Sequence, residues 1–243
     1  MAMRRAVTLL AISGIIAVSN GTAHAHARDP HLGGEDGRSR SPTILPDYAL
    51  PAPGSYRLPP IRQAHDGKVI DADGAEHSLF ELMEGHYVLL SFIYTGCYDP
   101  RGCPLAIYAL NAVREELDDD PATSGKVLLL TVSFDPENDT PEVMREFAEA
   151  RGFGEERSRR EWRFLTTSSK AGLQPILDGY GQYVVRETGE DGRPSGAYSH
   201  VLKVFLIDPD RNVRNIYSTG FLYPELILND IRTLIGEEES GVR

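Results

Sequence analysis

Residues 87–117 have the sequence YVLLSFIYTGCYDPRGCPLAIYALNAVREEL, which includes the only two cysteines of the chain. The segment 87–94, YVLLSFIY, is a continuous apolar run, typical of a strand that is buried on both faces of a sheet. Residues 104–117 have helical periodicity and start with proline, which is favoured in the first turn of a helix. The stretch therefore predicts a buried strand, a loop that carries Cys97 and Cys103, and a helix.

The sequence on either side continues this alternation of strands and helices. In chain order we expect a hairpin at 65–79, a buried strand at 126–134, helices at 139–150 and 170–183, a buried strand at 200–208 paired with 212–218, and a closing helix at 224–235. Buried strands that alternate with helices indicate an α/β protein with a central mixed sheet flanked by helices. A strand, a cysteine loop and a helix, followed later by a hairpin and a last helix, favour a thioredoxin-like fold with an N-terminal hairpin.

The N-terminal region has the features of an export signal. Arg4 and Arg5 precede an apolar stretch at 6–18, and small residues flank His24 in the sequence AHA. This pattern is typical of a cleaved signal peptide at 1–25, and an uncleaved N-terminal anchor is the alternative. The next segment, 26–60, contains seven prolines and little apolar periodicity. We expect it to be a disordered tether, with the folded domain at 61–243.

Composition and charge narrow the class of protein. The chain has 243 residues, of which 41% are hydrophobic and 25% charged, as expected for a globular protein with a core. The formal net charge is −11, and so acidic a balance argues against nucleic-acid binding. Export places the protein in the periplasm or another extracytoplasmic compartment, where the signal region could also serve as a membrane tether. Two nearby thiols in such an oxidising compartment form a disulfide or hold a metal.

The spacing of Cys97 and Cys103 leaves three interpretations. A stabilising disulfide is the least favoured, because it would close a very short loop and loop-closure stabilisation grows with loop length. Cys103 precedes the predicted helix, where unpaired N–H groups and the helix dipole favour a thiolate. A thiolate suits thiol–disulfide exchange, and two thiolates are also the ligands that a soft ion such as Cu(I) prefers.

A third ligand must come from elsewhere in the chain, and His200 is the best-placed histidine. It lies at the start of the predicted strand 200–208, which faces the cysteine loop in a thioredoxin-like sheet. An imidazole beside two thiols suits a copper site. Asp135 follows the predicted strand 126–134 at the same edge of the sheet. It is either a turn-capping aspartate or a weak ligand that supports Cu(II) from outside the primary ligand set.

Several motifs resemble the Sco/SenC family of copper-binding proteins that assist cytochrome c oxidase assembly. They occur in the family's order and are FIYTGC at 92–97, CPLA at 103–106, SFDPENDTPE at 133–142, WRFLT at 162–166, YGQY at 180–183 and SHVLKVFLIDPDRNV at 199–213. The resemblance covers residues 60–236. It implies a thioredoxin-like fold that binds one copper ion through Cys97, Cys103 and His200. It also implies delivery of copper, or of reducing equivalents, to the dinuclear copper site of the oxidase.

The cysteine loop departs from the family pattern. Five residues separate the cysteines, where the family usually has three, as if Arg101 and Gly102 had been added. Tyr98 also replaces the proline that usually follows the first cysteine. We expect this longer loop to affect copper affinity, redox potential or the choice of partner.

Three functions follow in order of preference. The first is an exported copper metallochaperone rather than an enzyme, with a copper-receiving client that is the copper subunit of cytochrome c oxidase or another copper protein. The second is an exported thiol–disulfide oxidoreductase that acts on client cysteines through a redox-active Cys97–Cys103 disulfide. The third is a zinc site, since two cysteines, one histidine and a water form a known zinc ligand set.

Overall fold

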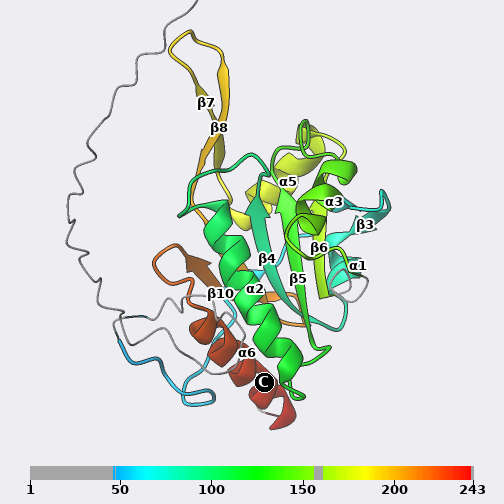
Figure 1. Ribbon diagram of the computed structural model, residues 1–243. Coiled ribbons are helices and arrows are strands. Elements are labelled where there is room, and N and C mark those ends of the chain that lie inside the picture. The colour runs from blue at the N-terminus through cyan, green and yellow to red at the C-terminus, as the bar shows by residue number, and fades with distance from the viewer. Residues whose placement is uncertain (1–45, 47, 156–160, 242–243) are drawn as a thin grey trace, which may run out of the picture. The chain divides into compact units, whose positions relative to one another are not determined.

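The computed structural model describes residues 46, 48–155 and 161–241 (Figure 1). The predicted signal peptide at 1–25 and the tether up to residue 45 lie outside these ranges. Within them, no helix is both long enough and apolar enough to cross a membrane.

Ten strands and five helices make up the described chain. The strands are β1 (Arg62–Gln63), β2 (Lys68–Asp71), β3 (Glu76–Ser78), β4 (Tyr87–Ile93), β5 (Val127–Ser133), β6 (Trp162–Thr166), β7 (Val184–Thr188), β8 (Pro194–His200), β9 (Lys203–Ile207) and β10 (Asn212–Ser218). The helices are α1 (Leu79–Met83), α2 (Cys103–Asp119), α3 (Pro141–Glu149), α5 (Lys170–Tyr180) and α6 (Pro224–Glu239).

Eight of the strands form one sheet in the order β1-β10-β9-β4-β5-β6-β2-β3, and β7 pairs only with β8. At the centre of the sheet, β4, β5 and β6 run parallel, and β9 runs antiparallel to β4. The β2–β3 hairpin is joined to the sheet through β6. The structure confirms the predicted mixed sheet with helices and an N-terminal hairpin.

Side chains of β4 show that helices cover both faces of the sheet. The Tyr87 hydroxyl donates a hydrogen bond to the carbonyl of Leu234 in α6 at 3.3 Å. The Phe92 ring instead packs against the Tyr180 ring of α5, with centroids 5.6 Å apart. Because side chains alternate along a strand, residues five apart point to opposite faces. Helix α6 therefore lies on one face, together with α2 (Figure 1), and α5 lies on the other.

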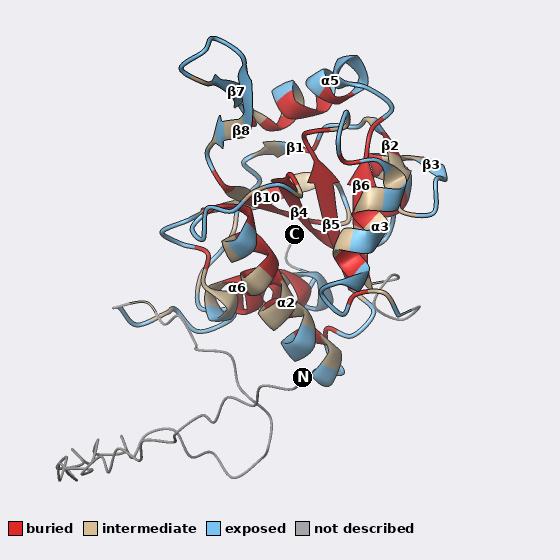
Figure 2. Ribbon diagram, turned by 45° about the horizontal axis from the view of Figure 1, so that its top comes forward, coloured by how far each residue is buried: buried red, intermediate tan, exposed pale blue. Residues whose placement is uncertain are grey.

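The two central strands form the middle of the hydrophobic core. Every residue of β4 and of β5 is buried, as Figure 2 shows by their colour. Burying each large apolar side chain stabilises the fold by about 1.5–3 kcal/mol relative to exposure. Such two-sided burial explains why the continuous apolar runs at 87–94 and 126–134 predict these strands.

The structure differs from the predicted elements around His200. His200 is the last residue of β8 in the β7–β8 hairpin, and the buried strand β9 begins only at Lys203. The apolar run that suggested a strand from residue 200 thus spans two elements. The strands β1, β6, β7 and β8 were not predicted, and β7 and β8 are largely exposed, so no apolar pattern marks them.

The chain just before β1 is held against α6. The Gly54 amide donates a hydrogen bond to the Thr233 hydroxyl at 2.9 Å, and the Tyr56 hydroxyl donates one to the Asp230 carboxylate. Asp230 is almost fully buried, with 1% of its surface exposed. Residues 51–60, which the composition assigns to the tether, therefore make specific contacts with the folded domain.

Candidate metal centre

The structure brings Cys103 and His200 together at the start of α2. Cys103 is the first residue of this helix and is buried, whereas Cys97 lies half-buried in the loop that follows β4. The Nε2 atom of His200, at the end of β8, lies 3.8 Å from the Cys103 sulfur. Both sulfurs are free thiols. Residues that are 97 positions apart in the chain thus meet through the fold of the hairpin.

The distance between these two donor atoms suits a shared metal ion. A bond of about 2.3 Å to sulfur and one of about 2.0–2.1 Å to nitrogen would place the two donors roughly 3.6–3.8 Å apart, for angles between tetrahedral and trigonal. The observed 3.8 Å lies at the upper end of this range. Thiolates and imidazole are soft or borderline ligands. Copper and zinc bind such ligands, whereas magnesium and calcium prefer oxygen ligands. The residues present therefore fit a thiophilic ion.

The Cys97 thiol, the third candidate ligand, is adjacent to this pair but not part of a closed ligand set. The Cys97 thiol is close enough to Cys103 to raise the pKa of that thiol, in addition to the larger rise caused by burial. Throughout the described ranges, however, no three His, Cys, Asp or Glu side chains converge as tightly as ligands of a bound metal. Cys97 is therefore adjacent to the Cys103–His200 pair without completing a three-ligand set with it.

Burial also governs the charge of the centre. It raises the pKa of the Cys103 thiol, which opposes the stabilisation of a thiolate that the helix N-terminus predicts. It lowers the pKa of the His200 imidazole, although the nearby Asp99 carboxylate opposes this effect. A neutral imidazole has a free lone pair and is the form that binds metals. The buried environment thus favours a neutral His200 that is ready to act as a ligand.

Aromatic rings form one wall of the centre. The Phe134 ring packs edge-on against His200, with centroids 4.8 Å apart. Tyr94 and Tyr198 complete a cluster in which each ring lies 5.1–5.5 Å from the others and from Phe134. The four rings come from the ends of β4 and β5 and from β8. Phe134 packs against His200 directly, and the two tyrosine rings pack against Phe134, so the cluster supports the imidazole from one side.

Asp135 lies near this wall but has other contacts. Its Oδ2 atom accepts a hydrogen bond from the Asn138 side chain at 2.7 Å, and 4% of the residue is exposed. Its carboxylate adds to the rise that burial causes in the pKa of the Tyr198 hydroxyl. Asp135 therefore interacts with Tyr198, whose ring belongs to the same aromatic wall as His200. Its role as a weak ligand remains a prediction.

Asp139 is a supporting residue that the sequence pattern did not reveal. Its carboxylate accepts hydrogen bonds from the Thr95 amide at 3.0 Å, from the Thr95 hydroxyl and from the Ser133 hydroxyl. These bonds join the start of the cysteine loop to the end of β5. The sequence suggested only that Asp139 opens a helix, and the capping residue of α3 is Thr140. A buried acid cannot be recognised without knowing which donors surround it.

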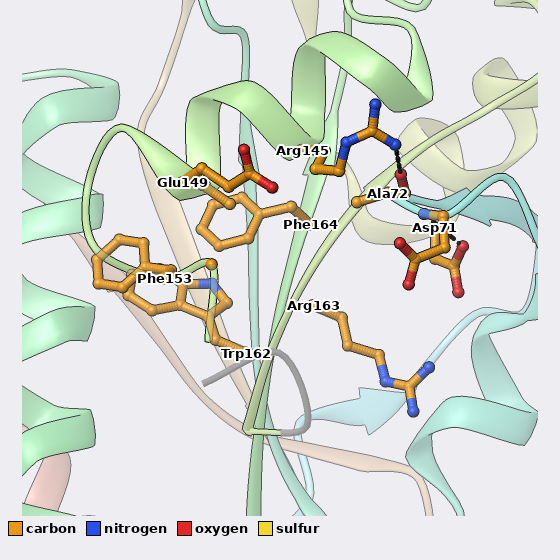
Figure 3. Close-up of a pocket in the computed structure, with 11 residues that line it drawn as sticks. Asp71, Ala72, Arg145, Glu149, Phe153, Trp162, Arg163 and Phe164 are labelled. Carbon is orange, nitrogen blue, oxygen red and sulfur yellow. Dashed lines mark hydrogen bonds between the residues drawn. The ribbon is translucent and has the colours of Figure 1, made fainter. Parts of the chain in front are cut away.

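Two cavities of the described chain lie away from this centre. One cavity of about 230 Å³ is lined by residues of the β2–β3 turn, α3 and β6. Figure 3 shows Arg145, Glu149 and Arg163 around it, together with the rings of Trp162 and Phe164. A second cavity, of about 320 Å³, lies between α6 and the segment that precedes β1. Neither is lined by cysteine or histidine, so neither can be the thiol–imidazole site.

The fold and the site define a thioredoxin-like protein with a pair of cysteines at a helix start and a histidine facing them. Comparison with known proteins gives the family. The SCO1/SenC family model matches residues 65–236, and the chain belongs to this family.

Individual relatives agree with this assignment. The SCO1 protein homolog of Bacillus subtilis (strain 168) is 27% identical over 168 residues, which cover 68% of this chain and 76% of the relative. The copper-bound ScoI of Arabidopsis thaliana superposes with a TM-score of 0.59 at 20% identity, covering 72% of this chain and 98% of that one. Apo Sco1 of Thermus thermophilus gives a TM-score of 0.57 at 25% identity, with coverages of 74% and 95%. These structures confirm the thioredoxin-like fold.

Proposed function

We propose that this protein is an exported copper metallochaperone that binds one copper ion through Cys97, Cys103 and His200. The observation that carries the proposal is the 3.8 Å approach of His200 Nε2 to the Cys103 sulfur, with the Cys97 thiol adjacent. Family membership and the copper-bound Arabidopsis structure support the choice of copper among thiophilic ions.

Copper transfer would proceed by exchange of ligands. Cys97 is the more accessible of the two sulfurs, so an incoming ligand from a client would meet the ion on that side. The client is the copper subunit of cytochrome c oxidase or another copper protein. Export through the segment 1–25, with or without a retained membrane anchor, would place the protein beside clients in the periplasm.

Titration of the reduced protein with Cu(I) tests this function. We expect one tightly bound ion per chain and a loss of affinity of at least tenfold in a His200→Ala variant. His86→Ala is the matched control, because the His86 ring contacts the Glu84 carbonyl and precedes β4, whose other end leads into the cysteine loop. Parent-like affinity in His200→Ala would refute the proposed ligand set. Metal analysis of the purified protein separates copper from zinc.

A second candidate function is thiol–disulfide exchange on client cysteines, because both thiols are free and adjacent. This function requires Cys97 and Cys103 but no metal. We expect metal-free protein to reduce a disulfide substrate slowly. Fast turnover that is unchanged in His200→Ala would favour the oxidoreductase over the metallochaperone.

A further inference from the structure

The two additional residues of the cysteine loop form part of a tight turn. The Gly102 amide donates a hydrogen bond to the Asp99 carbonyl at 2.9 Å, and the Arg101 amide donates one to the Asp99 carboxylate at 3.0 Å. The residue order Asp-Pro-Arg-Gly is the one that a type I turn favours at its four positions. Because residues 99–102 fold back on themselves, the longer loop still leaves Cys97 beside Cys103.

Gly102 occupies the position at which this turn meets α2. A Cβ atom placed on Gly102 would lie 3.3 Å from the Cys97 sulfur and 3.3 Å from the Asp99 carbonyl oxygen. Both distances are tighter than an ordinary Cβ contact, so a side chain at this position would require its neighbours to give by a few tenths of an ångström. The Cys97 thiol therefore occupies space that any side chain on residue 102 would need.

We propose that Gly102 is a positioning residue of the metal centre, whose missing side chain lets the Cys97 thiol lie against the start of α2. This inference rests on the proposed copper function. In Gly102→Ala both crowded neighbours must give by a few tenths of an ångström. The Asp99 carbonyl is held in the turn by its hydrogen bond, whereas the Cys97 side chain rotates about a single bond. The sulfur therefore moves, and the spacing of the ligands changes.

Copper binding by Gly102→Ala tests the proposal, with Gly220→Ala as the matched control. A Cβ on Gly220 meets no atom within 4 Å. With Cu(I) in competition with a chromogenic chelator, we expect Gly102→Ala to lose about tenfold in affinity, the loss typical of disturbed supporting contacts around a metal. We also expect its thiolate-to-Cu(II) absorption band to shift. Gly220→Ala should match the parent in both measurements. Parent-like affinity and an unshifted band in Gly102→Ala would overturn the proposal.

A metal-free measurement keeps this inference separate from the proposed function. Oxidised glutathione accepts two electrons from Cys97 and Cys103, which become a disulfide as two glutathione thiols form. We expect this reaction to be several-fold slower in Gly102→Ala than in Gly220→Ala, whether or not the parent binds copper. If the parent binds no copper, the proposed function fails, but the comparison of oxidation rates still tests whether Gly102 positions the Cys97 thiol. Equal rates would overturn the positioning role.

A further variant covers the case in which Gly102→Ala does not fold. Replacing Cys97 by alanine removes the sulfur that obstructs the new methyl group. The Gly102→Ala change should then lower the urea midpoint less in the Cys97→Ala background than in the parent, because only the contact with the Asp99 carbonyl remains. A double variant that remains unfolded would place the conflict at the Asp99 carbonyl and contradict the role given to the sulfur.

Discussion

Replacing Asp139 by alanine should destabilise the protein and loosen the cysteine loop. Asp139 has 1% of its surface exposed, and its carboxylate accepts hydrogen bonds from the Thr95 amide, the Thr95 hydroxyl and the Ser133 hydroxyl. Each buried donor that loses its acceptor costs about 1–3 kcal/mol. Thr95 is only half-buried and both hydroxyls can rotate toward new partners, so we expect a total loss of about 2–4 kcal/mol.

Urea unfolding followed by far-ultraviolet circular dichroism measures this loss. With a slope of about 1–3 kcal/mol per molar urea, the midpoint should fall by roughly 1–2 M. The control is Asp119→Ala, at the exposed last position of α2, which should change the free energy of unfolding by less than about 0.5 kcal/mol. A loss below about 1 kcal/mol in Asp139→Ala would refute the claim that this carboxylate joins the loop to β5.

The pH dependence gives a second readout of Asp139. Burial raises the pKa of its carboxyl group, and the neighbouring Asp135 charge adds to the rise, while hydrogen bonds from Ser133 and Thr95 oppose it. An acid whose pKa is higher in the folded state contributes stability below its unfolded pKa, and this contribution is lost as the pH rises through the folded pKa. Asp139→Asn should therefore lose less stability than the parent as the pH rises from about 4. Parallel profiles would contradict this assignment.

Three further predictions concern other parts of the molecule. Burial raises the pKa of Asp66, but hydrogen bonds from Ser78 and from two backbone amides outweigh it and hold the pKa below its usual value. The ionised Asp66 therefore stabilises the folded state above about pH 4, and this contribution is lost as the pH falls. Asp66→Asn should flatten the acid limb of the curve of stability against pH, and an unchanged limb would contradict the prediction. Tyr56→Phe leaves the buried Asp230 with one donor fewer and should cost about 1–3 kcal/mol in urea unfolding, a neutral result being inconsistent with the contact. Copper at 100 times its dissociation constant should stabilise the protein by about 2.7 kcal/mol, and removing it with a chelator should lower the melting temperature accordingly; an unchanged melting temperature would count against binding to the folded state.

The centre of the fold is predictable from the sequence because strands that are buried on both faces consist of continuous apolar runs. Strands β4 and β5 are buried at every position, and the runs at 87–94 and 126–134 mark them. Strand β6 lies next to β5 in the sheet but has only five residues, with Arg163 second among them, so periodicity does not reveal it. The β7–β8 hairpin is mostly exposed and pairs outside the main sheet, so only the folded structure shows it.

The candidate site was predictable in its residue types but not in its local geometry. The close spacing of Cys97 and Cys103 and the position of His200 indicated a metal centre. The order Asp-Pro-Arg-Gly at 99–102 carried a turn signal that explains the longer loop, and it could have been recognised beforehand. That the Cys97 sulfur lies where a side chain on residue 102 would be could not be predicted, because this depends on where the thiol packs after folding.

The contacts between the segment before β1 and α6 determine where this protein can be shortened. A protein that starts at residue 61 would lack Gly54 and Tyr56, and the Thr233 hydroxyl and the buried Asp230 carboxylate would lose their partners from this segment. Such a truncation would expose part of α6 to solvent and promote fraying of the C-terminal helix. Recombinant versions for solution or crystallographic work should therefore keep the chain from about residue 48 onward, even though proline-rich composition suggests that it can be trimmed.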